Sequence, residues 1–528
     1  MQKNKIFYVL GAISLTLALG GCGGGSSGSS DGSNGSVSNP GGGPTAAPMS
    51  RFDLANDCFV MRANSAYVVR DGNTFIANSD DAAGAERFYM RAANIGRYLF
   101  YTSDRKLMTA DGFVVRARTV PEDGSDWTFA GDQGRYTATA IGRALNTNSE
   151  GRLAVGNPAL AARLEFEPAT GCSVYPEMPT GIDAPTYTGP PAGQPVIGFA
   201  EVHSHMGMGS ELSDGSEDVG PSAGGVLYGQ AIHRFGAPHA LEDCERLHGP
   251  DGTLSAENIL LDFDPLQMHD TQGWPSFIDW PERDSFLHQQ MYYKWVERAY
   301  KAGLRTMTIH GTTIEALCNL AKATFGDKNA ECEDMITGTQ QVQYMYDVQD
   351  YVDAQEGGPG QGWFRIVRSP AEARSVIAQG KLAVILGLEF SNIFHCRVQF
   401  LPGGGETSDC TRADIEREID EAWELGVRQV FPYHDVDSSL GGTGIFSSIL
   451  NYVGFSDTRG FWKTYDCENG GVGPTYFYDA GAELETGALG LFNDPVTQIL
   501  RDATEGLVPL YPPGRQCNAR TVTDLGKF

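Results

Sequence analysis

The sequence has 528 residues, a formal net charge of -27 and a pI near 4.7. A chain of this length can form two or three domains, and its 41% hydrophobic residues suffice for a buried core. The acidity excludes a nucleic-acid partner, because binding to phosphates needs clustered Lys and Arg, which this sequence lacks.

The N-terminus has the pattern of a bacterial export signal. Lys3 and Lys5 precede an apolar run, residues 6–19, that is too short to cross a bilayer comfortably. We therefore expect residues 1–21 to be a signal peptide that is removed on export.

The end of this signal, "LGGC", resembles a lipobox, which implies that Cys22 carries a lipid; the alternative is an ordinary signal peptide with a chance cysteine. Residues 22–50 are rich in Gly and Ser and predict a flexible tether. We expect a protein that is lipid-anchored in the bacterial cell envelope and faces the periplasm or the cell surface.

Nine cysteines follow Cys22, and an exported chain meets conditions in which disulfides form. Their spacing suggests three pairs, which are Cys318 with Cys332, Cys396 with Cys410, and Cys58 with Cys172. Because nine is odd, one thiol is left over.

Residues 51–175 contain short alternating segments separated by turn residues, a pattern that predicts an all-β domain. Two segments, "IGRYLFYTSDRKL" (95–107) and "IGRALNTNSEGRL" (141–153), form an internal repeat. A β-trefoil-like fold is expected, with a small β-sandwich as the alternative. Such a domain could bind a glycan or another partner, or serve only as a packing module.

Residues 176–195 are rich in Pro and Gly and mark a linker. Beyond them, apolar runs that resemble strands buried on both faces alternate with amphipathic helices. The runs begin at residues 195, 303, 381 and 426, and the helices cover 288–303, 369–381 and 412–426. This order predicts an α/β fold over residues 196–528, namely a (β/α)8 TIM-type barrel.

Each predicted strand of this barrel ends in residues that can bind a metal or a substrate. Since the carboxyl ends of barrel strands converge on the active site, these side chains are expected to share one site. In an extended strand, His203 and His205 point to the same side and can bind one metal ion. The other strand ends supply His310, Glu389, and His434 with Asp435.

Glu389 and His310 also have simpler interpretations. Glu389 follows an apolar strand, where its charge must be matched either by a metal ion or by a cation such as Arg305. His310 either lines the site or is a strand-end histidine satisfied by the backbone. His434 is expected to face the substrate.

Two segments carry patterns that are more specific than these strand ends. "KLAVILGLEFSN" (381–392) runs into Glu389, and "IDEAWELGVRQVFPYHDVDSSLGG" (419–442) leads through a helix and a strand to His434. Both resemble the membrane dipeptidases (renal dipeptidase type) of the amidohydrolase superfamily. One departure is the His-Ser-His motif at 203–205, where these dipeptidases usually carry His-x-Asp.

The resemblance implies metal-assisted hydrolysis of an amide or peptide bond in a small substrate, with two Zn²⁺ ions as cofactors. It implies that Glu389 bridges the ions, that His203 and His205 bind one of them, and that His434 steadies the oxyanion. His434 and Asp435 are therefore the candidate catalytic residues.

The family fold needs eight strands and further ligands from the later ones, whereas residues 196–528 supply four such strands and all ten histidines lie at or before His434. We therefore expect an incomplete barrel that is inactive or weakly active alone, with a separately encoded C-terminal half as a candidate partner. A missing segment could also pair the odd cysteine. Two alternatives are a non-catalytic surface lipoprotein with a glycan- or partner-binding β domain, and a phosphoesterase that uses the His-x-His motif.

Overall fold

The structure is a computed structural model that describes residues 48–191, 193–209, 227–255, 268–277, 285, 287–324, 330–445, 448–467 and 516–528. The expected signal peptide (1–21), the lipidation site Cys22 and nearly all of the tether (22–50) lie outside these residues. None of the helices in the described ranges is long and apolar enough to cross a bilayer.

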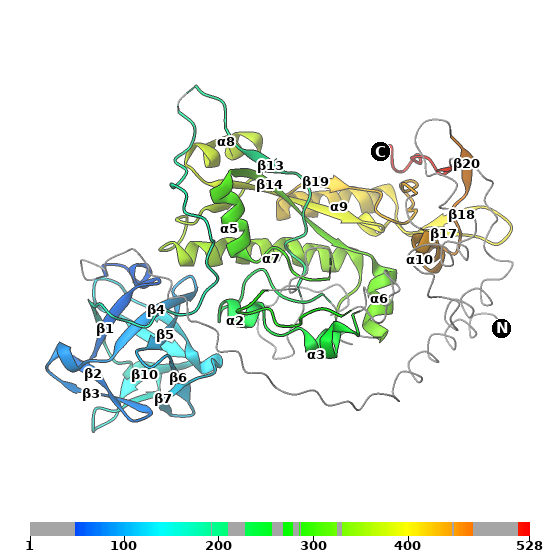
Figure 1. Ribbon diagram of the computed structural model, residues 1–528. Coiled ribbons are helices and arrows are strands. Elements are labelled where there is room, and N and C mark those ends of the chain that lie inside the picture. The colour runs from blue at the N-terminus through cyan, green and yellow to red at the C-terminus, as the bar shows by residue number, and fades with distance from the viewer. Residues whose placement is uncertain are drawn as a thin grey trace.

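The N-terminal domain is an antiparallel β structure, drawn in blue and cyan in Figure 1. Its strands are β1 (Cys58–Ala63), β2 (Ala66–Asp71), β3 (Thr74–Ser79), β4 (Arg87–Asn94), β5 (Arg97–Thr102), β6 (Leu107–Asp111), β7 (Val114–Arg118), β8 (Asp126–Ala130), β9 (Thr137–Ala140), β10 (Arg143–Thr147), β11 (Leu153–Gly156) and β12 (Leu164–Pro168). The expectation of an all-β domain is confirmed.

Six of these strands close into a ring. β12, β1, β4, β5, β8 and β9 pair in that order, and a bridge between Tyr136 and Leu164 joins the two ends. The other six form the hairpins β2–β3, β6–β7 and β10–β11, which also pair with one another. The domain therefore consists of a small barrel with three hairpins at one end.

The two copies of the internal repeat occupy different places in this arrangement, because β5 belongs to the ring and β10 to a hairpin. The first forms β5 and the turn into β6, and the second forms β10 and the turn into β11. Each copy starts with a turn in which a glycine has a positive φ, 67° at Gly96 and 70° at Gly142, a conformation that costs glycine little. Aromatic rings fill the barrel, with Phe100 packed against Phe88, Trp127 and Phe166.

The C-terminal region is built on a parallel sheet, as expected for an α/β fold. Its order is β13-β14-β16, and β15 and β19 pair with successive parts of the far edge of β16. The strands are β13 (Phe199–Glu201), β14 (Leu304–Thr313), β15 (Phe364–Ile366), β16 (Leu382–Phe390) and β19 (Val427–Phe431). Within the described ranges these strands form an open sheet and not a closed barrel.

Helices and short hairpins accompany this sheet. The α-helices are α2 (Ala237–Ala240), α3 (Glu245–His248), α5 (Tyr293–Ala302), α6 (Glu315–Thr324), α7 (Asp334–Gln355), α8 (Pro370–Ala378), α9 (Arg412–Leu425) and α10 (Ser448–Thr458). Two antiparallel pairs are β17 (Val398–Phe400) with β18 (Glu406–Ser408) and β20 (Thr464–Asp466) with β21 (Gln516–Asn518). The 3-10 helices are η1 (Arg51–Leu54), η2 (Ala82–Gly84), η3 (Asp123–Ser125), η4 (Pro158–Leu160), η5 (Pro250–Gly252) and η6 (Ile393–His395).

The three helices predicted from sequence correspond to α5, α8 and α9, and local signals set their ends. Ser369 caps α8 by accepting a hydrogen bond from the Glu372 N–H, and Pro370 occupies the first turn. Thr411 forms a capping box with Asp414 at the start of α9, and Gly426, with φ 106°, ends it.

The prediction that every strand is buried on both faces is wrong for two of them. β14 and β16 are almost entirely buried, whereas β13 is exposed throughout and β19 is mostly exposed. The reason is their position, because in the described part of the chain β13 pairs only with β14 and β19 only with β16.

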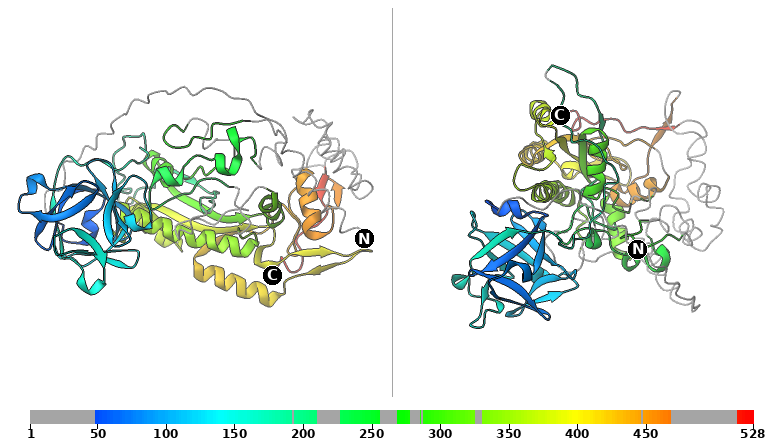
Figure 2. Two further views of the ribbon diagram at one scale, coloured as in Figure 1. Left: turned by 90° about the horizontal axis from the view of Figure 1, so that it is seen from below. Right: turned by 60° about the vertical axis from the view of Figure 1, so that its left-hand side comes forward.

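Helix α7 connects the two domains. It packs against β14, β15 and β16, and the Gln341 side chain hydrogen-bonds to both the N–H and the C=O of Thr312. At its other end the Gln355 amide donates to the Ala92 carbonyl in β4. Figure 2 shows the β domain beside one end of the parallel sheet.

The three expected disulfides, Cys58–Cys172, Cys318–Cys332 and Cys396–Cys410, are confirmed. A fourth joins Cys467 to Cys517. Four disulfides indicate an extracytoplasmic location, since such bonds persist in oxidising compartments.

Candidate functional site

The carboxyl ends of β13 and β16 bring three of the predicted ligands together. The Nε2 atom of His203 lies 2.7 Å from Oε2 of Glu389, and the Nε2 atom of His205 lies 3.4 Å from the same oxygen. The two histidines follow β13, whereas Glu389 is the penultimate residue of β16. Their three donor atoms all lie within 4.8 Å of one another.

His434 reaches the same carboxylate from the loop after β19. Its Nε2 atom lies 3.4 Å from Oε1 of Glu389 and 3.1 Å from Oδ2 of Asp435. The Ser391 hydroxyl donates a hydrogen bond to the His434 carbonyl, which fixes the loop against the end of β16. The two candidate catalytic residues therefore lie beside the three candidate ligands.

His310 lies in β14, fully buried, with its ring centroid 4.6 Å from that of His203. Neither ring nitrogen has a hydrogen-bond partner among the described residues, so the backbone does not satisfy the imidazole. The Arg305 guanidinium donates to the Tyr300 and Leu304 carbonyls. The structure therefore supports neither simpler interpretation. The backbone does not satisfy His310, and the hydrogen bonds that the structure shows for Arg305 are made to backbone carbonyls and not to Glu389.

Burial determines the charge of these groups. It lowers the pKa of His205, His310 and His434 to about 4, so these imidazoles are neutral near pH 7. It raises the pKa of Glu389, against the opposing effect of His203, and it raises the pKa of Asp435 to about 7, with the Glu389 charge adding to the effect.

The donor set of His203, His205 and Glu389 fits a zinc ion. Two imidazoles and one carboxylate are a common ligand set of catalytic zinc sites. Two ligands that each lie ~2.1 Å from a tetrahedral ion are about 3.4 Å apart. His205 lies 3.4 Å from Glu389, whereas His203 lies closer to it, at 2.7 Å. The buried His310 imidazole and the partly exposed His434 imidazole beside them each have at least one ring nitrogen without a hydrogen-bond partner in the described ranges.

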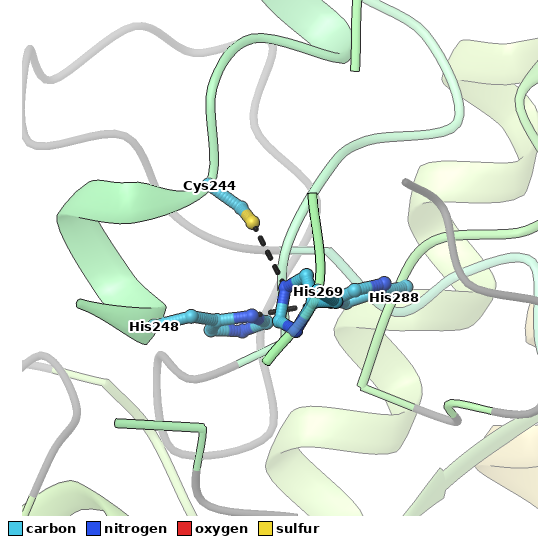
Figure 3. Close-up of side chains that lie close together, drawn as sticks. All are labelled: Cys244, His248, His269 and His288. Carbon is cyan, nitrogen blue, oxygen red and sulfur yellow. Dashed lines mark hydrogen bonds between the residues drawn. The ribbon is translucent and has the colours of Figure 1, made fainter. Parts of the chain in front are cut away.

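A second group of metal-binding side chains was missed by the sequence analysis. Cys244, His248, His269 and His288 are all buried and place their donor atoms within 4.8 Å of one another (Figure 3). This group could hold a metal ion. The sequence carried one signal for it, because the odd cysteine is followed four residues later by a histidine, a spacing that places both on one side of a helix.

No family model and no curated protein matches this chain. Solved structures with partial likeness include an endo-β-galactosidase from Clostridium perfringens (12% identity, TM-score 0.19, covering 21% of this chain and 32% of that one). A Polyporus squamosus lectin shows 11% identity and a TM-score of 0.19, with 21% and 49% covered. SeviL bound to asialo-GM1 saccharide shows 13% identity and a TM-score of 0.17, with 20% and 94% covered. The matches thus span less than half of the enzyme and of the lectin, and TM-scores of this size establish neither fold nor ligand.

Proposed function

We propose that this chain is a metal-dependent hydrolase of the membrane dipeptidase type that cleaves amide or peptide bonds in small substrates. The observation that carries the proposal is the meeting of His203 and His205 at one oxygen of Glu389, 2.7 and 3.4 Å away, at the carboxyl ends of parallel strands. This is the edge of an α/β sheet at which active sites form.

In this proposal His203, His205 and Glu389 hold zinc. Zinc supplies a Lewis acid and lowers the pKa of a bound water to about 7. The carboxylate lies in a nearly buried position, where an ionised group is costly unless a cation compensates its charge. The two imidazoles are partly exposed, so a substrate can approach the site from their side.

The proposed roles of His434 and Asp435 follow from their protonation. The His434 imidazole is neutral at pH 7, so it can donate a hydrogen bond from Nε2 to a substrate oxygen that gains charge. The Asp435 carboxyl has a pKa of about 7, which lets Oδ2 take up or release a proton near neutral pH.

The fold of each domain and the lipid anchor are also part of this proposal. We infer that the β domain is a β-trefoil, supported by its ring of six strands and its three hairpins. We infer that the parallel sheet is part of a (β/α)8 barrel, supported by the sequential order of β13, β14 and β16. The lipid anchor at Cys22 is proposed from the sequence alone.

The test uses the full mature chain, incubated with Zn²⁺ and a panel of dipeptides and N-acyl amino acids. Weak hydrolysis by the wild type is expected, because the described strands form an incomplete barrel, and His203→Ala should lose this activity together with the zinc of this site. His434→Ala is expected to keep zinc and to lose activity about 10²–10³-fold, the effect of removing one hydrogen-bond donor to an oxyanion.

The control is His395→Ala. The ion-pair contacts of His395 in the described ranges are with Glu333 and Glu418, neither of which is a candidate ligand or catalytic residue, so this variant is expected to keep the wild-type activity. The hydrolase proposal fails if the wild type binds zinc, this binding requires His203, and no substrate of the panel is cleaved.

That negative result would favour the alternative of a non-catalytic surface protein. Its β domain would then bind a glycan or a protein partner. Binding of the isolated wild-type chain to a glycan array, unaffected by His203→Ala, is the expected behaviour of such a protein.

A further inference from the structure

The second cluster lies in the interior of the α/β region, on a part of the chain that the proposed hydrolase site does not use. The Sγ atom of Cys244 is 3.3 Å from Nε2 of His269, and Nε2 of His288 is 3.1 Å from Nδ1 of His248. The His248 and His288 rings stack at 4.9 Å (Figure 3). All four side chains are less than 9% exposed.

Three separate chain segments supply these side chains. Cys244 is the N-cap of α3 and His248 is its last residue, so one short turn of helix presents both. The Cys244 N–H donates to the Thr271 carbonyl, which holds the His269 segment beside the helix. His288 forms a β-bridge with Tyr228, which joins the third segment to the chain that precedes α2.

We propose that Cys244, His248, His269 and His288 form a structural zinc site. One thiolate and three imidazoles are ligands that zinc prefers, and they exclude Mg²⁺ and Ca²⁺, which take oxygen ligands. For Zn–S near 2.3 Å and Zn–N near 2.1 Å, tetrahedral ligands lie about 3.4–3.6 Å apart. The separations of 3.1 and 3.3 Å lie close to these values.

A structural role follows from the number and burial of the donors. Four protein ligands complete a tetrahedral shell, whereas a catalytic site keeps one position open for water or substrate. The His203 side chain of the first site is 41% exposed, which contrasts with the enclosed second cluster.

Such a zinc site would also crosslink the surrounding chain. Between Gly209 and Tyr292 the described segments contain only α2, α3 and η5, each of three or four residues. No disulfide reaches into this stretch from the described cysteines, because the four bonds lie before residue 173 or after residue 317. Binding of zinc would contribute folding free energy to a stretch whose described residues contain little regular structure, with release of the thiol proton of Cys244.

Cobalt substitution tests the site directly, because Co²⁺ replaces zinc and a bound thiolate adds a charge-transfer absorption. The full chain loaded with Co²⁺ is expected to show this absorption. His203→Ala, which removes a ligand of the other site, is expected to retain it, and Cys244→Ser is expected to lose it. A folded wild type without the absorption, or an unchanged absorption in Cys244→Ser, would overturn the proposal.

Since Cys244→Ser could fail to fold, a second measurement uses no substitution in the cluster. In folded His203→Ala, a strong chelator is expected to make Cys244 at least tenfold more reactive toward an alkylating reagent, and added Zn²⁺ to reverse the change. Labelling that is independent of chelator and zinc would show that burial and hydrogen bonds alone protect this thiol, and would contradict the proposal.

Discussion

The imidazole of His310 lies directly against Gly387 in the neighbouring strand. The two residues are paired in the register of β14 and β16, and a Cβ atom added to Gly387 would lie 2.4 Å from Cδ2 of His310. The ring therefore occupies the space that any larger residue at 387 would need. The absence of a side chain at this position permits His310 to stand beside His203.

Gly387→Ala is expected to destabilise the protein by about 1–3 kcal/mol, the usual cost of overpacking a core, because the ring or the strand must move. Urea unfolding measures the loss. The matched control is Gly444→Ala, where an added Cβ meets nothing within 4 Å and the change should stay within about 0.5 kcal/mol. Equal effects of the two substitutions would show that His310 is not packed as described.

Acid is expected to destabilise the metal-free protein. His205, His310 and His434 have pKa values of about 4 in the folded state, below the 6.5 of an unfolded chain. Between these values the unfolded state binds more protons, so the free energy of unfolding is largest above pH 6.5 and decreases as pH falls toward about 4. Urea titrations of chelator-treated protein at several pH values measure this slope.

His310→Gln tests the contribution of one ring to that slope. The fully buried His310 is expected to account for up to about 3 kcal/mol of the acid-dependent loss, so the variant should show a flatter dependence of stability on pH. A wild-type slope in His310→Gln would place the proton uptake elsewhere.

The first site could be predicted from sequence because a local sequence pattern marks each of its ligands. Each ligand stands at the end of an apolar run, and a parallel sheet brings such ends to one edge whatever the length of the connections. His203, His205, Glu389 and His434 converge for this reason. Their roles in binding and catalysis remain predictions.

The second cluster and α7 could not be anticipated in this way. Cys244, His269 and His288 lie on segments with little regular structure, so no periodic pattern relates them. Helix α7 also buries polar residues such as Asp334, Thr337 and Gln341, and its sequence therefore lacks the apolar stripe from which an amphipathic helix is recognised. Gly338, in its first turns, permits close packing, because a Cβ there would lie 1.7 Å from Cζ of Phe390.

Removal of the Cys58–Cys172 bond is expected to destabilise the β domain. The bond joins β1 to the segment after β12 across 114 residues, so it restricts nearly the whole unfolded domain. A Cys58→Ala/Cys172→Ala variant should lose about 2–5 kcal/mol, measured by thermal or urea unfolding. The aromatic core around Phe100 should still form at low temperature, as near-ultraviolet circular dichroism would show.

The control for this variant is Cys396→Ala/Cys410→Ala. Its bond spans 14 residues in the other domain, so it should leave the unfolding of the β domain unchanged. If removal of either bond lowered the stability of the β domain by the same amount, the conclusion that the Cys58–Cys172 bond specifically stabilises this domain would be wrong.

A buried ion pair joins the β domain to the linker and to the α/β region. The Arg91 guanidinium in β4 donates to Oε2 of Glu177 at 2.7 Å and to the Tyr351 hydroxyl of α7 at 2.9 Å. The hydroxyls of Tyr292 and Tyr293 donate to the same carboxylate. Within this network the Arg91 side chain is only 5% exposed, so neither charge is well solvated.

Arg91→Met is expected to cost about 3–5 kcal/mol in urea unfolding, because the variant leaves the Glu177 carboxylate, which is only 17% exposed, without its cation. The Arg91→Met/Glu177→Gln double variant removes both charges and should be less destabilised than the sum of the two single variants. Arg163→Met, which breaks the more exposed pair with Glu165, should change stability by less than about 1 kcal/mol. Additive effects of the two network substitutions would mean that Arg91 and Glu177 stabilise the domain contact independently, through their separate contacts with the tyrosines.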